Sequence, residues 1–253
     1  MRNVRLLLEY DGSDFHGFQK QAKLRTVQGE LEAALATVLK HPVKVVGAGR
    51  TDAGVHALGQ VANFVTDSRM PIERMPVALN SRLPAEIVVH KAAEAAPDFD
   101  ARRSAHSRQY RYLVLNRPQP SAILARYACH VASPLDLGAM GRAARALVGE
   151  HDFASFQGGG SPARSTVRWV YRAQCRRLGP LVTVTLEANA FLYQMVRIAV
   201  RALIEVGRGR LPATVTAQWI RSAGTRRRLG PAPPQGLYLT RIRYGQRFWQ
   251  EAG

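Results

Sequence analysis

The sequence predicts an α+β fold of two similar α/β halves, each with an antiparallel-rich sheet flanked by helices. Three observations predict it: apolar, β-favouring runs alternate with helical stretches, hairpin turns join neighbouring strands, and 46% of the residues are hydrophobic, enough for a core. The hairpins favour this class over a doubly wound parallel sheet. The length of 253 residues suits one large domain or two half-size ones, and we place the halves at residues 1–105 and 106–253.

The N-terminal half is expected to begin with a strand at Val4–Tyr10, closed by the turn signal Asp11-Gly12. Thr26 can cap a helix, and His41-Pro42 would end it. The apolar stripe of that helix consists of Val27, Leu31, Leu35 and Val38. The other elements expected in this half are strands at 43–46, 61–66 and 87–90 and a second helix after Pro71.

The C-terminal half repeats this style without a literal sequence repeat. Ser133 can cap a helix that has Pro134 at its first position. Two apolar runs, 167–176 and 181–187, flank Leu178-Gly179-Pro180 in the manner of a hairpin. The buried stripe of a helix at 191–206 consists of Leu192, Val196, Ala199, Leu203 and Val206. The remaining expected elements are a strand at 109–115, a short helix around Trp219 and a closing strand at 236–244.

The net charge points to a polyanionic partner. Lys and Arg number 36 against 18 Asp and Glu, which gives a formal charge of +18 and a pI of about 11.0. For a folded protein this basic, nucleic acid is a better candidate than an acidic membrane surface. Of the basic residues, 31 are Arg. Two explanations stay open: the codon bias of a GC-rich genome, and the fit of guanidinium forks to phosphate.

The sequence carries neither a membrane-spanning nor a secretory pattern. No run of about 18 apolar residues occurs, and the apolar run near the start is too short for a secretory signal. Two cysteines, Cys129 and Cys175, do not make a disulfide framework in a chain of this length. We therefore expect a reducing, cytoplasmic location.

Absent motifs remove whole classes of chemistry. The sequence has neither a G-x-x-x-x-G-K-[ST] phosphate loop nor a G-x-S-x-G nucleophile elbow. Gly47 and Gly49 are followed by Asp52, where a dinucleotide fingerprint needs glycine. The His and Cys residues lack the spacing of zinc ligands. We expect no cofactor and no metal.

One carboxylate is set apart by its surroundings. Asp52 follows Arg50 in a glycine-rich turn that leaves a strand. Most aspartates in such turns only form an Asx-turn or cap a helix. A carboxylate next to a phosphate-binding guanidinium, with Gly49 and Gly54 allowing a ligand close to the backbone, also suits catalysis. The local sequence leaves both roles open.

The segment 49–57, GRTDAGVHA, resembles the signature of the tRNA pseudouridine synthase A family. Phe18 stands where Trp is common in that family. Further segments resemble the family's other motifs and follow in family order: 10–19, 107–112, 149–156, 188–197 and 232–239. The resemblance therefore covers essentially the whole chain.

This resemblance implies an RNA-binding isomerase of tRNA processing, which converts uridine to pseudouridine at positions 38 to 40 of the anticodon stem-loop. It also implies a central basic cleft, a flipped-out target base, a homodimer, and neither cofactor nor metal. Asp52 would be the catalytic aspartate. Breaking the N-glycosidic bond and rejoining uracil through C5 needs a nucleophile or base and no redox agent. Whether the carboxylate attacks ribose C1′, attacks uracil C6 or acts as a base toward a glycal stays open.

Two further site residues depend on the resemblance. Arg197 flanks the buried stripe of its helix, where it could simply snorkel or join Arg201 and Glu205 at i, i+4 spacing. The resemblance makes it the partner that holds Asp52 ionised and oriented. Tyr110 would bind the substrate by stacking on the target uracil, whereas Tyr112, on the same strand face, would be core packing.

Contacts to the RNA backbone are expected from basic residues in two segments, in addition to Arg50 at the substrate. These residues are Lys20, Lys23, Arg25, Arg226, Arg227 and Arg228. A cluster such as 226–228 is usually only a solvated loop. In a tRNA enzyme it is also a candidate for backbone contacts, because RNA helices are recognised mainly through shape and phosphate. Two rival functions stay open: a non-catalytic tRNA-binding protein with this fold, and a pseudouridine synthase acting on another RNA.

Overall fold

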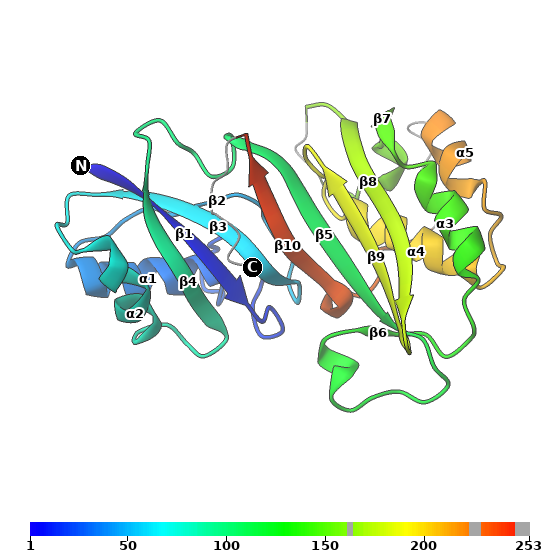
Figure 1. Ribbon diagram of the computed structural model, residues 1–253, viewed down its shortest axis with the longest axis horizontal. Helices are drawn as coiled ribbons and strands as arrows, with labels where there is room; N and C mark the ends of the chain where they lie inside the picture. The colour runs from blue at the N-terminus through cyan, green and yellow to red at the C-terminus, as the bar shows by residue number, and fades with distance from the viewer. Residues whose placement is uncertain (161–163, 223–228, 246–253) are drawn as a thin grey trace. The chain divides into compact units, whose positions relative to one another are not determined.

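The computed structural model describes residues 1–160, 164–222 and 229–245 (Figure 1). The chain divides into two compact units. Unit 1 comprises Met1–Arg108 and the described part of Tyr238–Gly253, and unit 2 comprises Gln109–Leu237. The boundary expected after residue 105 lies close to this division. The C-terminal strand differs, because it joins the first unit although the sequence placed it in the second half.

Unit 1 is a mixed sheet in the order β4-β1-β3-β10. The antiparallel pairs are β1 with β3, β1 with β4, and β2 with β3, whereas β10 runs parallel to β3. Tyr238 of β10 lies opposite His56, the first residue of β3. The strands are β1 (Arg2–Tyr10), β2 (Val46–Gly47), β3 (His56–Thr66), β4 (Ile87–Ala95) and β10 (Leu237–Tyr244).

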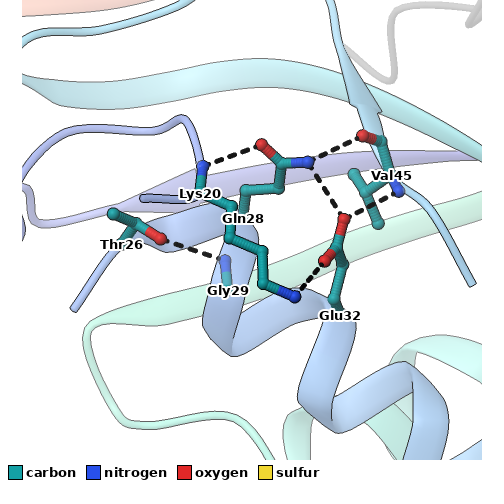
Figure 2. Close-up of polar contacts among 6 residues, drawn as sticks. All are labelled: Lys20, Thr26, Gln28, Gly29, Glu32 and Val45. Atoms are coloured by element: carbon teal, nitrogen blue, oxygen red, sulfur yellow. Dashed lines mark hydrogen bonds and ion pairs between the residues drawn. The ribbon is translucent and has the colours of Figure 1, made fainter. Parts of the chain in front are cut away.

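Helix α1 (Val27–Leu39) forms as its sequence predicts. Thr26 is its N-cap and accepts a hydrogen bond from the Gly29 N–H at 3.3 Å, as Figure 2 shows. Of the predicted stripe, all but Val38 are buried. The helix ends at Lys40, whose left-handed φ of 65° is incompatible with a further helical turn. The second expected helix follows Pro71 as the 3₁₀ turn η1 (Ile72–Arg74) and α2 (Met75–Asn80).

Unit 2 has the strand order β5-β9-β8-β7, with β6 beside β5. The expected hairpin is confirmed, because β8 and β9 are antiparallel and Leu178 lies opposite Leu181 across the turn. The strands are β5 (Ala105–Leu115), β6 (Cys129–His130), β7 (Gly149–Asp152), β8 (Val167–Leu178) and β9 (Leu181–Ala188). The sheets of both units are antiparallel-rich, which confirms the α+β class.

The helices of unit 2 pack on one another and on the hairpin. In Figure 1, α3 (Leu137–Arg145) lies along β8, and it also contacts α4 (Met195–Gly207). The predicted stripe of α4 is buried, as is Trp219 in α5 (Val215–Arg221). Short 3₁₀ turns complete the described elements: η2 (Leu124–Arg126), η3 (Ala154–Phe156) and η4 (Pro234–Gly236). No helix in the described ranges is both long and apolar enough to cross a membrane.

The prediction of a strand at 43–46 is wrong except for Val46, the first residue of β2. The N–H of Val45 donates to the Glu32 carboxylate at 3.1 Å, and the Val45 carbonyl accepts from the Gln28 amide at 3.1 Å (Figure 2). Both bonding groups of the Val45 backbone are thus taken by side chains of α1. The segment therefore lies against a helix instead of pairing with a strand.

Two helix starts also differ from expectation. The helix expected to begin at Ser133 begins at Leu137, because Asp136 is the cap and its carboxylate accepts from the Ala139 N–H at 2.9 Å. The helix expected from residue 191 begins at Met195, because Gln194 has a left-handed φ of 58°. In both cases a single residue, Asp136 or Gln194, determines where the helix begins, and the apolar pattern does not show it.

Candidate active site

Asp52 lies in the loop that joins β2 to β3, which we call the Asp52 loop (residues 48–55). The loop turns tightly, because the Val55 N–H donates to the Asp52 carbonyl at 3.1 Å. Asp52 is half-buried and Arg50 is exposed. One short turn thus offers a carboxylate and a guanidinium two residues apart, as the sequence predicts.

A second loop, residues 11–18, supports the Asp52 loop through backbone contacts. The Phe18 N–H donates to the Thr51 carbonyl at 3.1 Å, and the Gly54 N–H donates to the Phe15 carbonyl at 3.4 Å. A Cβ on Gly12 would lie 2.0 Å from the Val55 carbonyl oxygen, so only glycine permits this approach. Loop 11–18 and the Asp52 loop are therefore packed closely against each other.

His56 is a buried structural histidine at the end of the Asp52 loop. The Gly12 N–H donates to its Nδ1 at 3.0 Å, and the Asp11 carboxylate lies 3.1 Å from the same nitrogen. Its ring stacks on Tyr238, with centroids 4.8 Å apart. These contacts join the Asp52 loop to loop 11–18 and to β10, so His56 is fixed by its surroundings.

Arg108 ties the start of the Asp52 loop to the turn that carries Arg102. Its guanidinium donates to the Ala48 carbonyl at 3.2 and 3.3 Å, to the Ala105 carbonyl at 3.1 Å, and to the Arg102 carbonyl. Burial and then the charge of Arg102 lower the pKa of Arg50. The positive charges of Arg50 and Arg102 therefore repel one another, and an anion near them would relieve that repulsion.

The tyrosines of β5 in unit 2 have different settings. Tyr110 is 7% exposed and meets the ring of Phe191 edge-on at 5.2 Å. Tyr112 is fully buried, and its hydroxyl donates to the Pro233 carbonyl at 2.8 Å. Burial, as the largest cause, raises the pKa of Tyr112 far above its ordinary value. The packing role expected for Tyr112 is confirmed.

Arg197 lies in the first turn of α4 and is half-buried. Its Nε donates to the Ala232 carbonyl at 2.7 Å, and the Ala232 N–H donates to the Arg197 carbonyl at 3.0 Å. The segment at Ala232 thus fixes both the backbone and the guanidinium of Arg197.

Glu205 draws its ion pairs from other arginines of unit 2. Its carboxylate is nearly buried and lies 3.0 to 3.4 Å from guanidinium nitrogens of Arg201, Arg208 and Arg210. The charge of this acid is therefore balanced without Arg197. The i, i+4 pair that the sequence allowed forms between Arg201 and Glu205.

The predicted RNA-binding residues of unit 1 flank the start of α1. Lys20 pairs with Glu32 at 2.9 Å (Figure 2). Arg25 pairs with Glu30 and Glu86, both at 3.2 Å. Lys23 is exposed with a left-handed φ of 63°. Two of these three cations are already neutralised in part by an acid, so phosphate would have to compete for them.

Several predicted residues are not brought into one described arrangement. Asp52 and Arg50 share a loop in unit 1, whereas Tyr110 and Arg197 belong to unit 2. Arg226, Arg227 and Arg228 lie outside the described residues. In the ranges 1–160, 164–222 and 229–245, no group of three or more His, Cys, Asp or Glu side chains is placed to hold a metal ion.

Two residues that shape the Asp52 loop, Gln60 and Arg108, were not expected from the sequence. Arg108 bonds to backbone far away in the sequence, which no local pattern reveals. Gln60 is fully buried in β3 and bonds to Gly49 in the loop. A signal for Gln60 was present: an amide directly before the apolar strand 61–66 must find hydrogen-bond partners if it is buried.

Comparison with known proteins agrees with the motif positions. The family model described as tRNA pseudouridine synthase matches residues 7–102 and 143–245. The chain is 44% identical over 244 residues to tRNA pseudouridine synthase A of Acetivibrio thermocellus, covering 96% of this chain and 100% of that protein. It is 47% identical over 245 residues to tRNA pseudouridine synthase A of Moorella thermoacetica, covering 95% and 99%. The protein of that name from Brevibacillus brevis is 45% identical over 246 residues, covering 96% and 100%. The chain therefore belongs to the tRNA pseudouridine synthase A family and is a pseudouridine synthase, an isomerase.

Proposed function

We propose that this enzyme converts uridine to pseudouridine at positions 38 to 40 of the tRNA anticodon stem-loop, with Asp52 as the catalytic aspartate. The observation that carries the proposal is the Asp52 loop itself. A partly exposed carboxylate lies there beside an exposed guanidinium, on a turn held by backbone hydrogen bonds. A nucleophile or base must be held in such a fixed position before it can act on a single atom of a large substrate.

The reaction balances without an outside reagent. The C1′–N1 bond of uridine breaks, uracil turns, and a C1′–C5 bond forms. N1 gains a proton and C5 loses one, so the product is an isomer of the substrate. The Asp52 carboxylate has three compatible roles: attack on C1′, attack on C6, or removal of a proton on a path through a glycal.

The target base must leave the helical stack before the carboxylate can reach it. Unstacking costs a few kcal/mol, and stacking on an aromatic ring returns about 1–3 kcal/mol. We assign that stacking to Tyr110, whose ring packs edge-on against Phe191. We assign Arg197 the task of keeping Asp52 ionised and oriented. Its anchoring at Ala232 supports this, because a guanidinium with a fixed Nε presents its other nitrogens in a fixed direction.

The tRNA backbone would be held by cations around the Asp52 loop and beyond it. The positive charges of Arg50 and Arg102 repel one another, which favours an anion near them. Lys23 is exposed, whereas Lys20 and Arg25 would exchange a carboxylate for a phosphate. We also assign Arg226, Arg227 and Arg228 to RNA binding, on the charge of their segment alone. A central basic cleft is part of the same proposal.

We further propose a homodimer, with an interface at the N-terminal end of β8. Val148, Trp169 and Tyr171 are 42%, 49% and 39% exposed, and the two aromatic rings stack with centroids 6.2 Å apart. Val148 and Tyr171 line the same groove between α3 and β8, with a cavity volume of about 400 Å³. An exposed apolar cluster of this kind favours association with a second copy. Sedimentation of the Trp169→Lys variant as a monomer, with the wild type as a dimer, would support it, and a monomeric wild type would refute it.

We place the enzyme in the cytoplasm. Both cysteines are free in the structure, as a reducing compartment would keep them. Transfer RNA as the substrate agrees with that compartment.

Mapping of pseudouridine in cellular tRNA tests the proposed substrate position. The tRNA of a strain lacking this gene should lose pseudouridine at positions 38 to 40 and regain it when the wild-type gene is restored. A loss confined to another tRNA position, or to another RNA, would overturn the assignment. A strain with unchanged pseudouridine and reduced tRNA levels would instead favour a non-catalytic tRNA-binding role.

A further inference from the structure

We propose that Tyr10, Thr51 and Gln60 form a buried hydrogen-bonded brace that positions Arg50 and Asp52 for the reaction. The three side chains lie in unit 1, and all are buried. Gln60 contacts the Asp52 loop at Gly49, and Tyr10 contacts it at Thr51, so the contacts lie on either side of Arg50. The proposal rests on Asp52 acting in the chemistry, and it makes Tyr10, Thr51 and Gln60 positioning residues.

The Gln60 side chain makes the backbone hydrogen bonds to the Asp52 loop that a neighbouring strand would otherwise make. Its Nε2 donates to the Gly49 carbonyl at 2.7 Å, and its Oε1 accepts from the Gly49 N–H at 3.3 Å. One amide side chain thus satisfies both backbone groups of Gly49, as a paired strand would. Past β2 the loop leaves regular sheet pairing, so this contact fixes the backbone just before Arg50.

Tyr10 holds the other side of Arg50. Its hydroxyl and the Thr51 Oγ1 are 2.8 Å apart, and Gln60 Nε2 also donates to the Tyr10 oxygen at 3.4 Å. Burial raises the pKa of Tyr10 to about 12, although the hydrogen bonds to Thr51 and Gln60 act in the opposite direction. The hydroxyl therefore keeps its proton at physiological pH, and the brace stays intact.

The brace is anchored in two paired strands of unit 1. Tyr10 ends β1 and Gln60 lies within β3, and the two strands pair from Arg2 to Tyr10 with one register shift between Leu8 and Tyr10. Thr51 is also held through its carbonyl, which accepts from the Phe18 N–H at 3.1 Å. Gly49 and Thr51 are thus fixed to the paired strands, so the backbone of Arg50 and Asp52 has little freedom to move. A misplacement of about 1 Å can cost about 10²-fold in rate, so the brace should act on turnover.

A purely structural role is the alternative, and it makes a different prediction. Buried hydrogen bonds that only stabilise the fold would lower the melting temperature and leave the folded fraction with normal turnover. A positioning role lowers kcat in the folded enzyme and leaves tRNA affinity unchanged. It also predicts that a variant of Thr51 that retains the hydroxyl keeps most of the turnover.

The experiment compares Tyr10→Phe, Thr51→Val and Thr51→Ser with the wild type, as full-length folded enzymes. Turnover is the total pseudouridine formed in tRNA, which does not depend on which position is modified. We expect kcat to fall at least about 10-fold in Tyr10→Phe and Thr51→Val, with the Kd for tRNA within about twofold. Thr51→Ser should recover most of the rate. The double variant Tyr10→Phe/Thr51→Val should be no slower than Tyr10→Phe alone, because Tyr10→Phe already removes the hydrogen bond to Thr51.

Thr216→Val is the matched control. Thr216 in α5 is also fully buried, and its hydroxyl donates to the Ala143 carbonyl at 2.7 Å within unit 2. It should lose stability and keep its turnover. Normal kcat in Tyr10→Phe and Thr51→Val, or losses of kcat matched by Thr216→Val, would overturn the brace.

If Asp52→Asn is active while the brace variants are slow, the brace acts on something other than Asp52 and the proposal fails with the proposed mechanism. If Asp52→Asn is inactive while the brace variants are normal, only the brace fails.

Discussion

The Asp52 loop of unit 1 and helix α4 of unit 2 hold the proposed site residues Asp52 and Arg197 by different means. The Asp52 loop has almost no regular pairing and is fixed by side-chain and backbone hydrogen bonds at Gly49, Thr51 and Gly54. In α4, every residue except Arg197 and Arg201 is buried. The helix is therefore fixed by apolar packing, and Arg197 extends from a rigid base. The loop should be sensitive to the loss of single polar atoms, whereas the helix should transmit only the loss of the guanidinium itself.

Arg197→Met should have the largest effect on the helix side of this comparison. The methionine keeps the apolar stem and removes the charge, so α4 should stay folded. We expect turnover to fall by about 10²-fold, as for the loss of one electrostatic contact at a reacting centre, with the Kd for tRNA within about twofold. Single-turnover kinetics and tRNA titration separate the two quantities. A loss of affinity that accounts for the whole defect would show that Arg197 binds phosphate.

Gly12→Ala should have the next largest effect and tests the loop side. The added Cβ would lie 2.0 Å from the Val55 carbonyl, so the two loops must separate. We expect a loss of about 1–3 kcal/mol in the free energy of unfolding and a fall in turnover of about 10-fold or more. Gly141→Ala is the control, because a Cβ there meets nothing within 4 Å. Equal behaviour of the two variants would contradict the close packing of the loops.

The pH dependence of stability should show a smaller effect from the brace. Burial raises the pKa of Tyr10 from 10.0 to about 12 in the folded protein. Above pH 10 the unfolded chain therefore loses this proton first, and the stability present below pH 10 decreases as the pH rises toward 12. At pH 11 the decrease is about 1.4 kcal/mol.

The comparison with Tyr10→Phe isolates that contribution, because Tyr112 and Tyr244 also have raised pKa values and are present in both proteins. Urea unfolding at pH 9 and pH 11 should show the wild type losing about 1.4 kcal/mol more than Tyr10→Phe. Equal losses would mean that Tyr10 is not protected by its buried setting.

The smallest effect is expected on the salt dependence of tRNA affinity. It concerns cations that lie outside both the Asp52 loop and α4. Replacing Arg226, Arg227 and Arg228 with Ala should flatten the dependence of tRNA affinity on salt, because fewer counterions are released on binding. Lys20→Ala should change the slope less, because the Lys20 ammonium already pairs with Glu32 at 2.9 Å. An unchanged slope in the triple variant would show that these three arginines do not contact the phosphates of tRNA.

The sequence predicts those parts of the fold that depend on neighbouring residues. Helix α1 has its cap and its apolar stripe within one segment, so Thr26 and Leu31 are sufficient to predict it. The strand expected at 43–46 failed because side chains of α1 bond to Val45, which no local pattern shows. The pairing of β10 with β3 joins Tyr238 to His56, a contact set by the whole fold.

The same division holds for the candidate site. Asp52, Arg50, Tyr110 and Arg197 are predicted as site residues because each lies in a motif that resembles a known family. The residues around them could not be predicted. Gln60 and Arg108 act through the backbone of distant residues, Gly49 and Ala48, and only the folded chain brings these groups together. Short motifs thus suffice to propose catalytic residues, whereas the contacts that fix these residues join groups far apart in the sequence.

Tritium release from C5-labelled uridine in tRNA tests the central claim most directly, because the proton on C5 leaves only when the new C1′–C5 bond forms. Wild-type enzyme should release tritium, and Asp52→Asn, which keeps the size and loses the charge, should release it about 10³-fold more slowly or not at all. The variant should still bind tRNA with a Kd within about twofold of the wild type. Wild-type rates of release from Asp52→Asn would contradict the account.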